Sequence, residues 1–308
     1  MHGYTTCKKC LIMALNLSIL KTRSLTAAVF VIVMLTGLLW NPWSFFVLFS
    51  IIHFGCWSEY QEMMVLIDKD YRTISPFHRY SVPLAGWCLM MYFDQGNLAI
   101  AGLSLHVIGW WGCLSFLVLS VIGEILQYKS LNMANIGRSA LGLLYISVSL
   151  TMLMWLRTKF YKSPIPFADR IPVLMIIGSI WINDTMAYLV GSIIGRTPLS
   201  AISPKKTWEG TIVGIILAVG VMGLIGYWLN NEPAWALFAP GHWMAVAAIV
   251  SVTGTFGDLL ESKLKRMAGL KDSGRIMPGH GGFLDRFDSL LVATPFAFAY
   301  LLWVIYGS

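Results

Sequence analysis

Charged residues are scarce in this sequence, and so are cysteines. Only 12% of the 308 residues are charged, about half of the share that a soluble domain carries. The five cysteines are an odd number, and Cys7 and Cys10 form a lone CxxC without the second pair that a zinc site needs. No repeat of about 20 to 50 residues and no low-complexity linker interrupts the chain. These features exclude a soluble globule, a disulfide scaffold and a nucleic-acid-binding module.

Apolar runs fill the sequence instead, and 57% of its residues are hydrophobic. A helix needs about 20 apolar residues to cross a bilayer. Nine runs approach or exceed this length, at residues 25–40, 43–66, 80–94, 97–126, 138–156, 171–194, 208–229, 242–262 and 287–306. We therefore predict an all-α polytopic membrane bundle of about nine transmembrane helices, with residues 1–308 forming a single integral membrane domain. A break near Gly109 or Gly112 would divide the long run 97–126 into two pieces.

Lys and Arg are distributed unevenly between the two ends of these runs. If residues 1–24 form a cytoplasmic N-terminal segment, eighteen of the 22 Lys and Arg residues lie on the cytoplasmic side. This bias favours an inside N-terminus and an outside C-terminus. The four exceptions are Arg157, Lys159, Lys162 and Arg170. Residues 1–24 lack the pattern of a cleaved signal peptide, so we expect them to be retained.

Two polar stretches, residues 183–210 and 257–288, interrupt the apolar background on the predicted cytoplasmic side. In the first, Asp184 lies roughly 20 Å along its helix, where a carboxylate costs about 2.5 to 3.5 kcal/mol. One face of this helix carries Asp184, Tyr188, Gly191 and Gly195. The glycines on this face favour close packing of a neighbouring helix. Either Asp184 bonds to that helix or it lines a polar cavity open to the cytoplasm, and we favour the cavity.

The second stretch continues the pattern. One helix face carries Asp258, Glu261, Ser262 and Lys265. The segment "PGHGG" at 278–282 then supplies glycines whose backbone N–H groups can face an anion. Asp285, Arg286 and Asp288 follow where the last run begins. An N-cap would explain Asp285 alone but not its charged neighbours, and His280 is either a general acid or a turn residue.

These residue types share one chemistry. Carboxylates near a glycine turn hold Mg²⁺ while leaving coordination positions for phosphates. Lysines and arginines neutralise phosphate charge, and a helix N-terminus adds a favourable dipole. The pattern therefore predicts phosphoryl or nucleotidyl transfer at the membrane surface. Lys205 and Lys206 are placed to reach a triphosphate, although anionic lipid headgroups would attract them as well.

The segment Ser262–Asp288, "SKLKRMAGLKDSGRIMPGHGGFLDRFD", resembles the signature of the phosphatidate cytidylyltransferases, the CDP-diacylglycerol synthases. Met277 stands where that family usually has Leu, Ile or Phe. The stretches "DTMAYLVGSIIGR" and "SPKKTWEG" resemble the family's upstream motifs. The similarity covers residues 180–290, which carry the predicted catalytic motifs. The first 170 residues match only as apolar spans, with Glu59 in a familiar position.

The resemblance implies condensation of phosphatidic acid with CTP to give CDP-diacylglycerol and pyrophosphate, with Mg²⁺ as cofactor. It also implies a second metal at Asp258 and Asp285, for which K⁺ is a candidate. A homodimer is compatible with the resemblance. The residues predicted to act in catalysis are Asp258, Asp285, Lys265, His280 and Arg286. Those predicted to bind substrate are Lys205, Lys206, Ser262, Lys271, Gly281 and Gly282. Those predicted to bind metal are Asp258, Asp285, Asp184 and Asp288.

Three other functions compete with this one. A CTP-using polyprenol or dolichol kinase would transfer the γ-phosphate and release CDP. A transporter or channel would use Asp184 and Asp258 to line an ion pathway. A catalytically silent paralogue would serve only as an assembly partner. We expect a multi-pass protein of the bacterial inner (plasma) membrane, embedded among membrane lipids, with its active site facing the cytoplasm.

Overall fold

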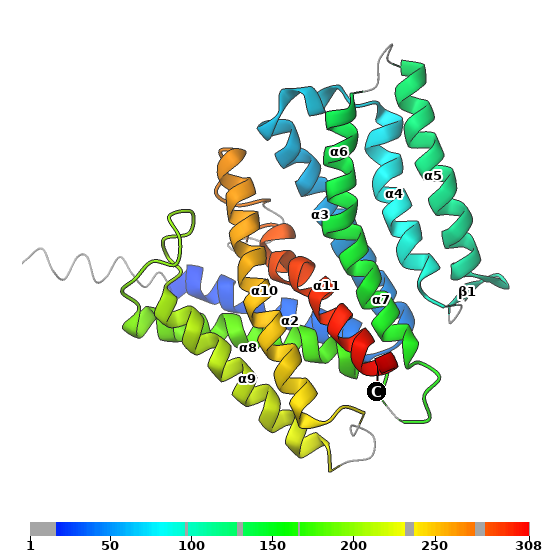
Figure 1. The fold of residues 1–308 in the computed structure, drawn as a ribbon. Coiled ribbons are helices and arrows are strands. Elements are labelled where there is room, and N and C mark those ends of the chain that lie inside the picture. Colours follow the sequence, from blue (N-terminus) through cyan, green and yellow to red (C-terminus); the bar gives the residue numbers. More distant parts are fainter. Residues whose placement is uncertain are drawn as a thin grey trace, which may run out of the picture.

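The computed structural model shows an almost entirely helical protein (Figure 1). It describes residues 17–95, 98–127, 132–165, 167–231, 237–274 and 281–307, with side chains from residue 25 onward. In chain order the helices are α2 (Leu17–Leu39), α3 (Pro42–Ile67), the 3₁₀ helix η1 (Lys69–Thr73), α4 (Pro76–Tyr92), α5 (Leu105–Gln127), α6 (Met133–Gly142), the π-helix η2 (Leu143–Val148), α7 (Ser149–Lys159), α8 (Ile171–Ile194), α9 (Trp208–Leu229), α10 (Pro240–Met267) and α11 (Leu284–Gly307). Two short strands, β1 (Ala99–Ile100) and β2 (Leu103–Ser104), form an antiparallel hairpin before α5.

Six segments of the described chain are long and apolar enough to cross a membrane, namely α5, Met133–Lys159, α8, α9, α10 and α11. They confirm an all-α polytopic membrane protein. Each of the nine predicted runs contains a helix, but the segments that cover the first three runs are not among these six.

The prediction of a break near Gly109 or Gly112 is wrong, because α5 runs through both residues without interruption. A side chain at Gly109 would overlap the α4 backbone at Cys88 and Tyr92. This glycine therefore serves close helix packing and does not end a helix.

Polar residues cap the helices that lead into the site. Asn41 Oδ1 accepts a hydrogen bond from Ser44 N at 2.8 Å where α3 begins. Thr207 Oγ1 accepts one from Gly210 N at 3.2 Å where α9 begins. Both bonds satisfy N–H groups that have no partner within the first turn of a helix. The caps thus fix where the chain enters α3 and α9.

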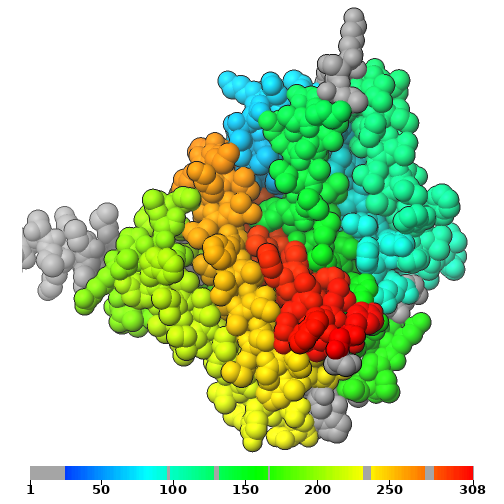
Figure 2. Space-filling model, viewed as in Figure 1, coloured from blue at the N-terminus to red at the C-terminus, as the bar shows by residue number. Residues whose placement is uncertain are grey.

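Helices α10 and α11 lie between the α8–α9 pair on one side and helices α4 to α7 on the other (Figures 1 and 2). Glycines bring these neighbours close together. A Cβ at Gly210 would stand 2.8 Å from Gly191 Cα, so the predicted glycine seam of α8 is confirmed at its contact with α9. A Cβ at Gly257 would stand 2.5 Å from Asp288 O, so α10 touches the first turn of α11 directly. Both contacts bring polar side chains of separate helices within reach of one another.

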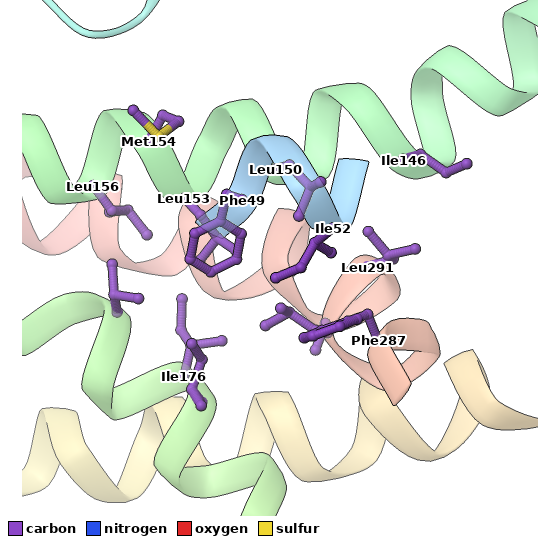
Figure 3. Close-up of a cluster of buried hydrophobic side chains, with 14 of the residues drawn as sticks. Phe49, Ile52, Ile146, Leu150, Leu153, Met154, Leu156, Ile176, Phe287 and Leu291 are labelled. Carbon is purple, nitrogen blue, oxygen red and sulfur yellow. The ribbon is translucent and has the colours of Figure 1, made fainter. Parts of the chain in front are cut away.

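A cluster of buried hydrophobic side chains holds the start of α11 in place (Figure 3). Phe49 and Ile52 of α3, Leu150 of α7, Ile176 of α8 and Leu291 of α11 belong to it, and each is at most 2% exposed. In a bilayer, such packing stabilises helix contacts mainly through van der Waals contact, since the lipid tails are equally apolar. The cluster fixes α11 against three helices that are distant in sequence.

Three of the four basic residues that depart from the charge bias have partners in the protein, among them Lys159, whose Nζ donates to Tyr306 Oη at 2.7 Å. Arg157 is 2% exposed and pairs with Asp169. The Arg170 guanidinium donates to Leu39 O at 2.9 Å, in the last turn of α2, and to Trp40 O at 3.2 Å, just after it. A cation at the C-terminus of a helix is favourable because the free carbonyls carry negative partial charge. These two arginines thus serve internal contacts, which explains their place outside the main basic group.

Candidate active site

Glu59 of α3 binds the first backbone N–H groups of α11. Its carboxylate accepts hydrogen bonds from Phe283 N at 2.8 Å and Leu284 N at 2.9 Å, and from Ser273 Oγ at 2.7 Å. Glu59 is only 3% exposed, and these three donors are what a buried carboxylate requires. A Cβ at Gly282 would overlap this carboxylate, so glycine is required there. Glu59 therefore ties the segment between α10 and α11 to α3.

Asp285 binds both ends of the same segment. Asp285 Oδ2 accepts from Ser273 N at 2.8 Å and from Gly282 N at 2.8 Å, and it lies 3.0 Å from Ser273 Oγ. Asp285 Oδ1 lies 2.6 Å from Lys265 Nζ. Gly281 has φ +82°, a left-handed conformation that glycine adopts without strain. The predicted catalytic residues Lys265 and Asp285 thus meet, at a turn closed by glycines.

Lys265 bridges two carboxylates. Its ammonium lies 2.5 Å from Glu261 Oε2, one turn back on α10, as well as 2.6 Å from Asp285 Oδ1 on α11. Glu261 is 1% exposed and the Lys265 side chain 12%. Ser262 Oγ, also buried, donates to Asp258 Oδ1 at 3.4 Å. The polar face of α10 predicted from spacing is therefore real, and it faces α11 at its C-terminal end.

A second group of charges forms around Lys206, which comes from the connection between α8 and α9. Lys206 Nζ lies 2.5 Å from Asp258 Oδ2. Asp184 and Asp288 interact electrostatically with both residues. The backbone places Lys206, because its carbonyl accepts from Leu199 N at 2.7 Å. We call Asp184, Asp258, Asp288 and Lys206 the acidic cluster; it joins the two polar stretches of the sequence.

Burial differs among the carboxylates of the acidic cluster. Asp288 is 7% exposed and accepts from Ser289 N at 2.6 Å, whereas Asp184 is exposed. Asp184 Oδ1 accepts a hydrogen bond from Asn183 Nδ2 at 3.2 Å, within its own helix. The polar cavity open to the cytoplasm stays a prediction for Asp184.

The donor set of the acidic cluster suits a hard divalent cation, because carboxylate oxygens are the ligands that Mg²⁺ prefers. The Lys206 ammonium already brings one positive charge to Asp258. Within the described residues, however, no three His, Cys, Asp or Glu side chains stand close enough to hold one metal ion. Asp285 fits less directly, since both of its oxygens are bonded to protein groups. Its role as a ligand stays a prediction, as do those of Asp184, Asp258 and Asp288.

A family model described as "Cytidylyltransferase family" matches residues 21–304. The chain belongs to this family. It is 45% identical over 118 residues to a phosphatidate cytidylyltransferase of Staphylococcus aureus, covering 38% of this chain and 43% of that protein. It is 37% identical over 132 residues to the Synechocystis phosphatidate cytidylyltransferase, covering 43% of each. It is 44% identical over 119 residues to phosphatidate cytidylyltransferase 4, chloroplastic, of Arabidopsis thaliana, covering 39% of this chain and 29% of that protein. The matched regions thus span less than half of each relative, and the family inferred from residues 262–288 is confirmed.

The other predicted site residues are exposed, form the turn before α11, or lie outside the described residues. Lys205, Lys271 and Arg286 are exposed, and Gly281 and Gly282 form the turn before α11. His280 lies outside the described residues, as do Cys7 and Cys10.

Glu59 and Ser273 are buried and were not predicted as site residues, although both contact the segment that carries the predicted ones. Ser273 donates its hydroxyl to Glu59 and its backbone N–H to Asp285. The signals for Glu59 were its carboxylate within the apolar run 43–66 and its familiar position in the family resemblance. Ser273 carried no signal beyond its place in the second polar stretch.

Proposed function

We propose that this protein is a phosphatidate cytidylyltransferase, which condenses CTP with phosphatidic acid to CDP-diacylglycerol and pyrophosphate. The observation that carries the proposal is the contact of Lys206 with Asp258, because it unites the two polar stretches in one charged site. Membership of the cytidylyltransferase family and the names of its relatives support the same reaction.

In this reaction an oxygen of the lipid phosphate attacks the α-phosphorus of CTP. A new P–O bond forms, the bond from the α-phosphorus to the bridging oxygen breaks, and pyrophosphate leaves. The substrate phosphate is itself the nucleophile, so the protein needs only to position the phosphates and stabilise their charge. We assign this task to Lys205, Lys206, Lys265 and Arg286. Lys206 and Lys265 are each held by carboxylates and enter the site from separate segments.

We further propose that the enzyme depends on Mg²⁺, held by Asp184, Asp258 and Asp288, with Asp285 in support. A bound Mg²⁺ supplies Lewis-acid stabilisation of phosphate charge. A second metal such as K⁺ belongs to the same proposal. In this scheme Asp285 keeps Lys265 and the glycine turn in position, which its hydrogen bonds support.

The proposed membrane arrangement has nine spans, a cytoplasmic N-terminus and a cytoplasmic active site in a bacterial inner membrane. The internal pairing of Arg157 and Arg170 supports it, since two of the four exceptions to the charge bias are thereby explained. Single cysteines at the exposed Lys263 and Lys162 test it in a variant in which all five native cysteines are replaced. An impermeant thiol reagent applied to intact cells should label Lys162→Cys and spare Lys263→Cys, and the reverse result would contradict the orientation. We also propose a homodimer, which cross-linking in native membranes tests.

The position of the label separates the proposed reaction from its rivals. Purified protein is supplied with phosphatidic acid, Mg²⁺ and CTP labelled at either the α- or the γ-phosphorus. The proposal requires α-label in the lipid and γ-label in pyrophosphate. In a parallel reaction with a polyprenol in place of phosphatidic acid, transfer of γ-label to the polyprenol would instead establish a kinase. Ion flux in liposomes without CTP, and no lipid labelling, would establish a transporter.

A further inference from the structure

A π-helical segment packs against α11, which carries part of the site. The π-helix η2 joins α6 and α7, and it packs against α3, α4 and α11. Such wide turns are rare in proteins and are frequent at functional sites, because they change the direction in which a side chain points. Tyr145 lies in the middle of η2. No residue of this segment was predicted to act in the site.

The hydroxyl of Tyr145 is buried and has no hydrogen-bond partner among the described residues. The groups that act on it electrostatically are, in decreasing order, those of Asp288, Glu261, Cys56 and Asp258. Two of these carboxylates belong to the acidic cluster, and Glu261 binds Lys265. The hydroxyl is therefore buried near the carboxylates of Asp288, Glu261 and Asp258.

Glu261 supplies a second unpaired atom at the same place. Its Oε2 binds Lys265, but its Oε1 is buried without a partner among the described residues. Buried polar atoms in proteins nearly always have hydrogen bonds, and those without a protein partner are commonly bound by an ordered water. One water molecule can accept a hydrogen bond from a tyrosine hydroxyl and donate one hydrogen bond to each of two carboxylates. Tyr145, Glu261 and Asp288 offer this set of one donor and two acceptors.

We propose that Tyr145 is a positioning residue of this site, whose hydroxyl donates to a buried water that in turn donates to Glu261 Oε1 and to Asp288. The water links α11 and α10 to η2 and sets the direction of the Asp288 carboxylate toward Asp258 and Asp184. This inference rests on the proposed function for its effect on turnover. Its geometry rests only on the buried atoms.

The test compares Tyr145→Phe with Tyr71→Phe in the full-length protein. Tyr71 of η1 is a matched control, since it is fully buried and its hydroxyl bonds Ser139 Oγ at 2.9 Å. No residue of the acidic cluster is among the groups that act on it electrostatically. The rise of Tm with Mg²⁺ is measured without substrates, and kcat and the CTP KM are measured with them. Loss of a group that orients metal ligands weakens metal affinity or activity by about tenfold or more.

We expect Tyr145→Phe to need about tenfold more Mg²⁺ for half of the Tm rise and to lose about tenfold in kcat, with an unchanged CTP KM. Tyr71→Phe should lower Tm and leave the Mg²⁺ midpoint unchanged. A wild-type Mg²⁺ midpoint and kcat in Tyr145→Phe would overturn the proposal.

An experimental structure that resolves water decides the geometry without any variant. A water bonded to Tyr145 Oη and Glu261 Oε1 is expected, whereas a direct bond from Tyr145 to a protein group would overturn the inference. The outcome is separable from that of the proposed function. A wild-type protein that transfers no label to lipid would contradict the reaction, while the water position would still decide the role of Tyr145.

Discussion

Ser273 Oγ donates to Glu59 Oε2 at 2.7 Å, between residues that are 214 positions apart in the chain. Ser273 also donates to Asp285 Oδ2 through its backbone N–H at 2.8 Å, and its hydroxyl oxygen lies 3.0 Å from the same atom. Two carboxylates therefore close the segment between α10 and α11 at its base. Because Lys265 binds Asp285 as well, the position of this segment and the position of a predicted catalytic cation depend on the same bonds.

Glu59→Gln should separate this anchoring from simple packing. Glutamine keeps the size of the side chain, but one of the two oxygens becomes an NH₂ group that cannot accept from Phe283 N or Leu284 N. We expect a loss of about 1 to 3 kcal/mol in stability and a fall in kcat of at least about tenfold. Thermal unfolding and CTP turnover in detergent measure the two effects. Glu62→Gln, one turn later on α3, is the control. Wild-type turnover in Glu59→Gln would refute the anchoring role.

Lys205 and Lys206 should differ although they are adjacent. Lys206 is held against Asp258 at 2.5 Å, whereas Lys205 is exposed. Replacing Lys206 with Ala removes a cation from the site and leaves Asp258 without it, so we expect kcat/KM to fall by more than about tenfold. Lys205→Ala should raise the CTP KM by only a few-fold, as expected for an exposed cation that contributes charge. Steady-state kinetics with varied CTP compare the two variants. Equal losses would contradict the difference in roles.

Asp258→Asn and Asp285→Asn should fail in different ways. If Asp258 binds Mg²⁺, its replacement raises the Mg²⁺ concentration needed for activity, and excess metal restores part of the turnover. Asp285 is bonded to Lys265, Ser273 and Gly282, so Asp285→Asn should abolish turnover at every Mg²⁺ concentration while the protein is still expressed. Mg²⁺ titrations of both variants test this. An active Asp285→Asn variant would refute the role of that residue.

The contact between α10 and α11 at Gly257 should tolerate no side chain. A Cβ there would stand 2.5 Å from Asp288 O, which is part of a helix backbone and cannot yield. Gly257→Val should cost about 1 to 3 kcal/mol and should lower turnover by moving Asp288. Gly220→Ala is the control, because apart from the backbone of its own helix α9 and its chain neighbours nothing lies within 4 Å of a Cβ at Gly220. Thermal unfolding measures the stability of both variants. Equal stability of Gly257→Val and Gly220→Ala would contradict the close contact.

The helices were largely predictable, because bilayer thickness sets a minimum apolar length that the sequence displays directly. The runs 171–194 and 208–229 coincide with α8 and α9 at both ends. The π-turn of η2 was not predictable, since it has no local sequence signature. The packing role of Gly109 was not predictable either, because it depends on the backbone of α4 and not on the residues next to Gly109 in the sequence.

The residue types of the site were predictable from the sequence, but their arrangement in space was predictable only in part. The spacing of Asp258, Glu261 and Lys265 indicated a shared helix face, which the structure confirms. The pairing of Lys206 with Asp258, and of Glu59 with Ser273, joins segments whose distance in space no local pattern encodes. Such contacts follow from how α3, α10 and α11 pack.

Mass spectrometry of the lipid product tests the central claim most directly. Purified protein is incubated with phosphatidic acid, CTP and Mg²⁺, and the lipid and the pyrophosphate are quantified together, with Asp258→Asn as the paired variant. The account predicts a lipid heavier by one cytidine monophosphate residue, one pyrophosphate for each such lipid, and little of either from Asp258→Asn at low Mg²⁺. Unchanged phosphatidic acid with CDP as the released nucleotide, or equal product from Asp258→Asn, would contradict it.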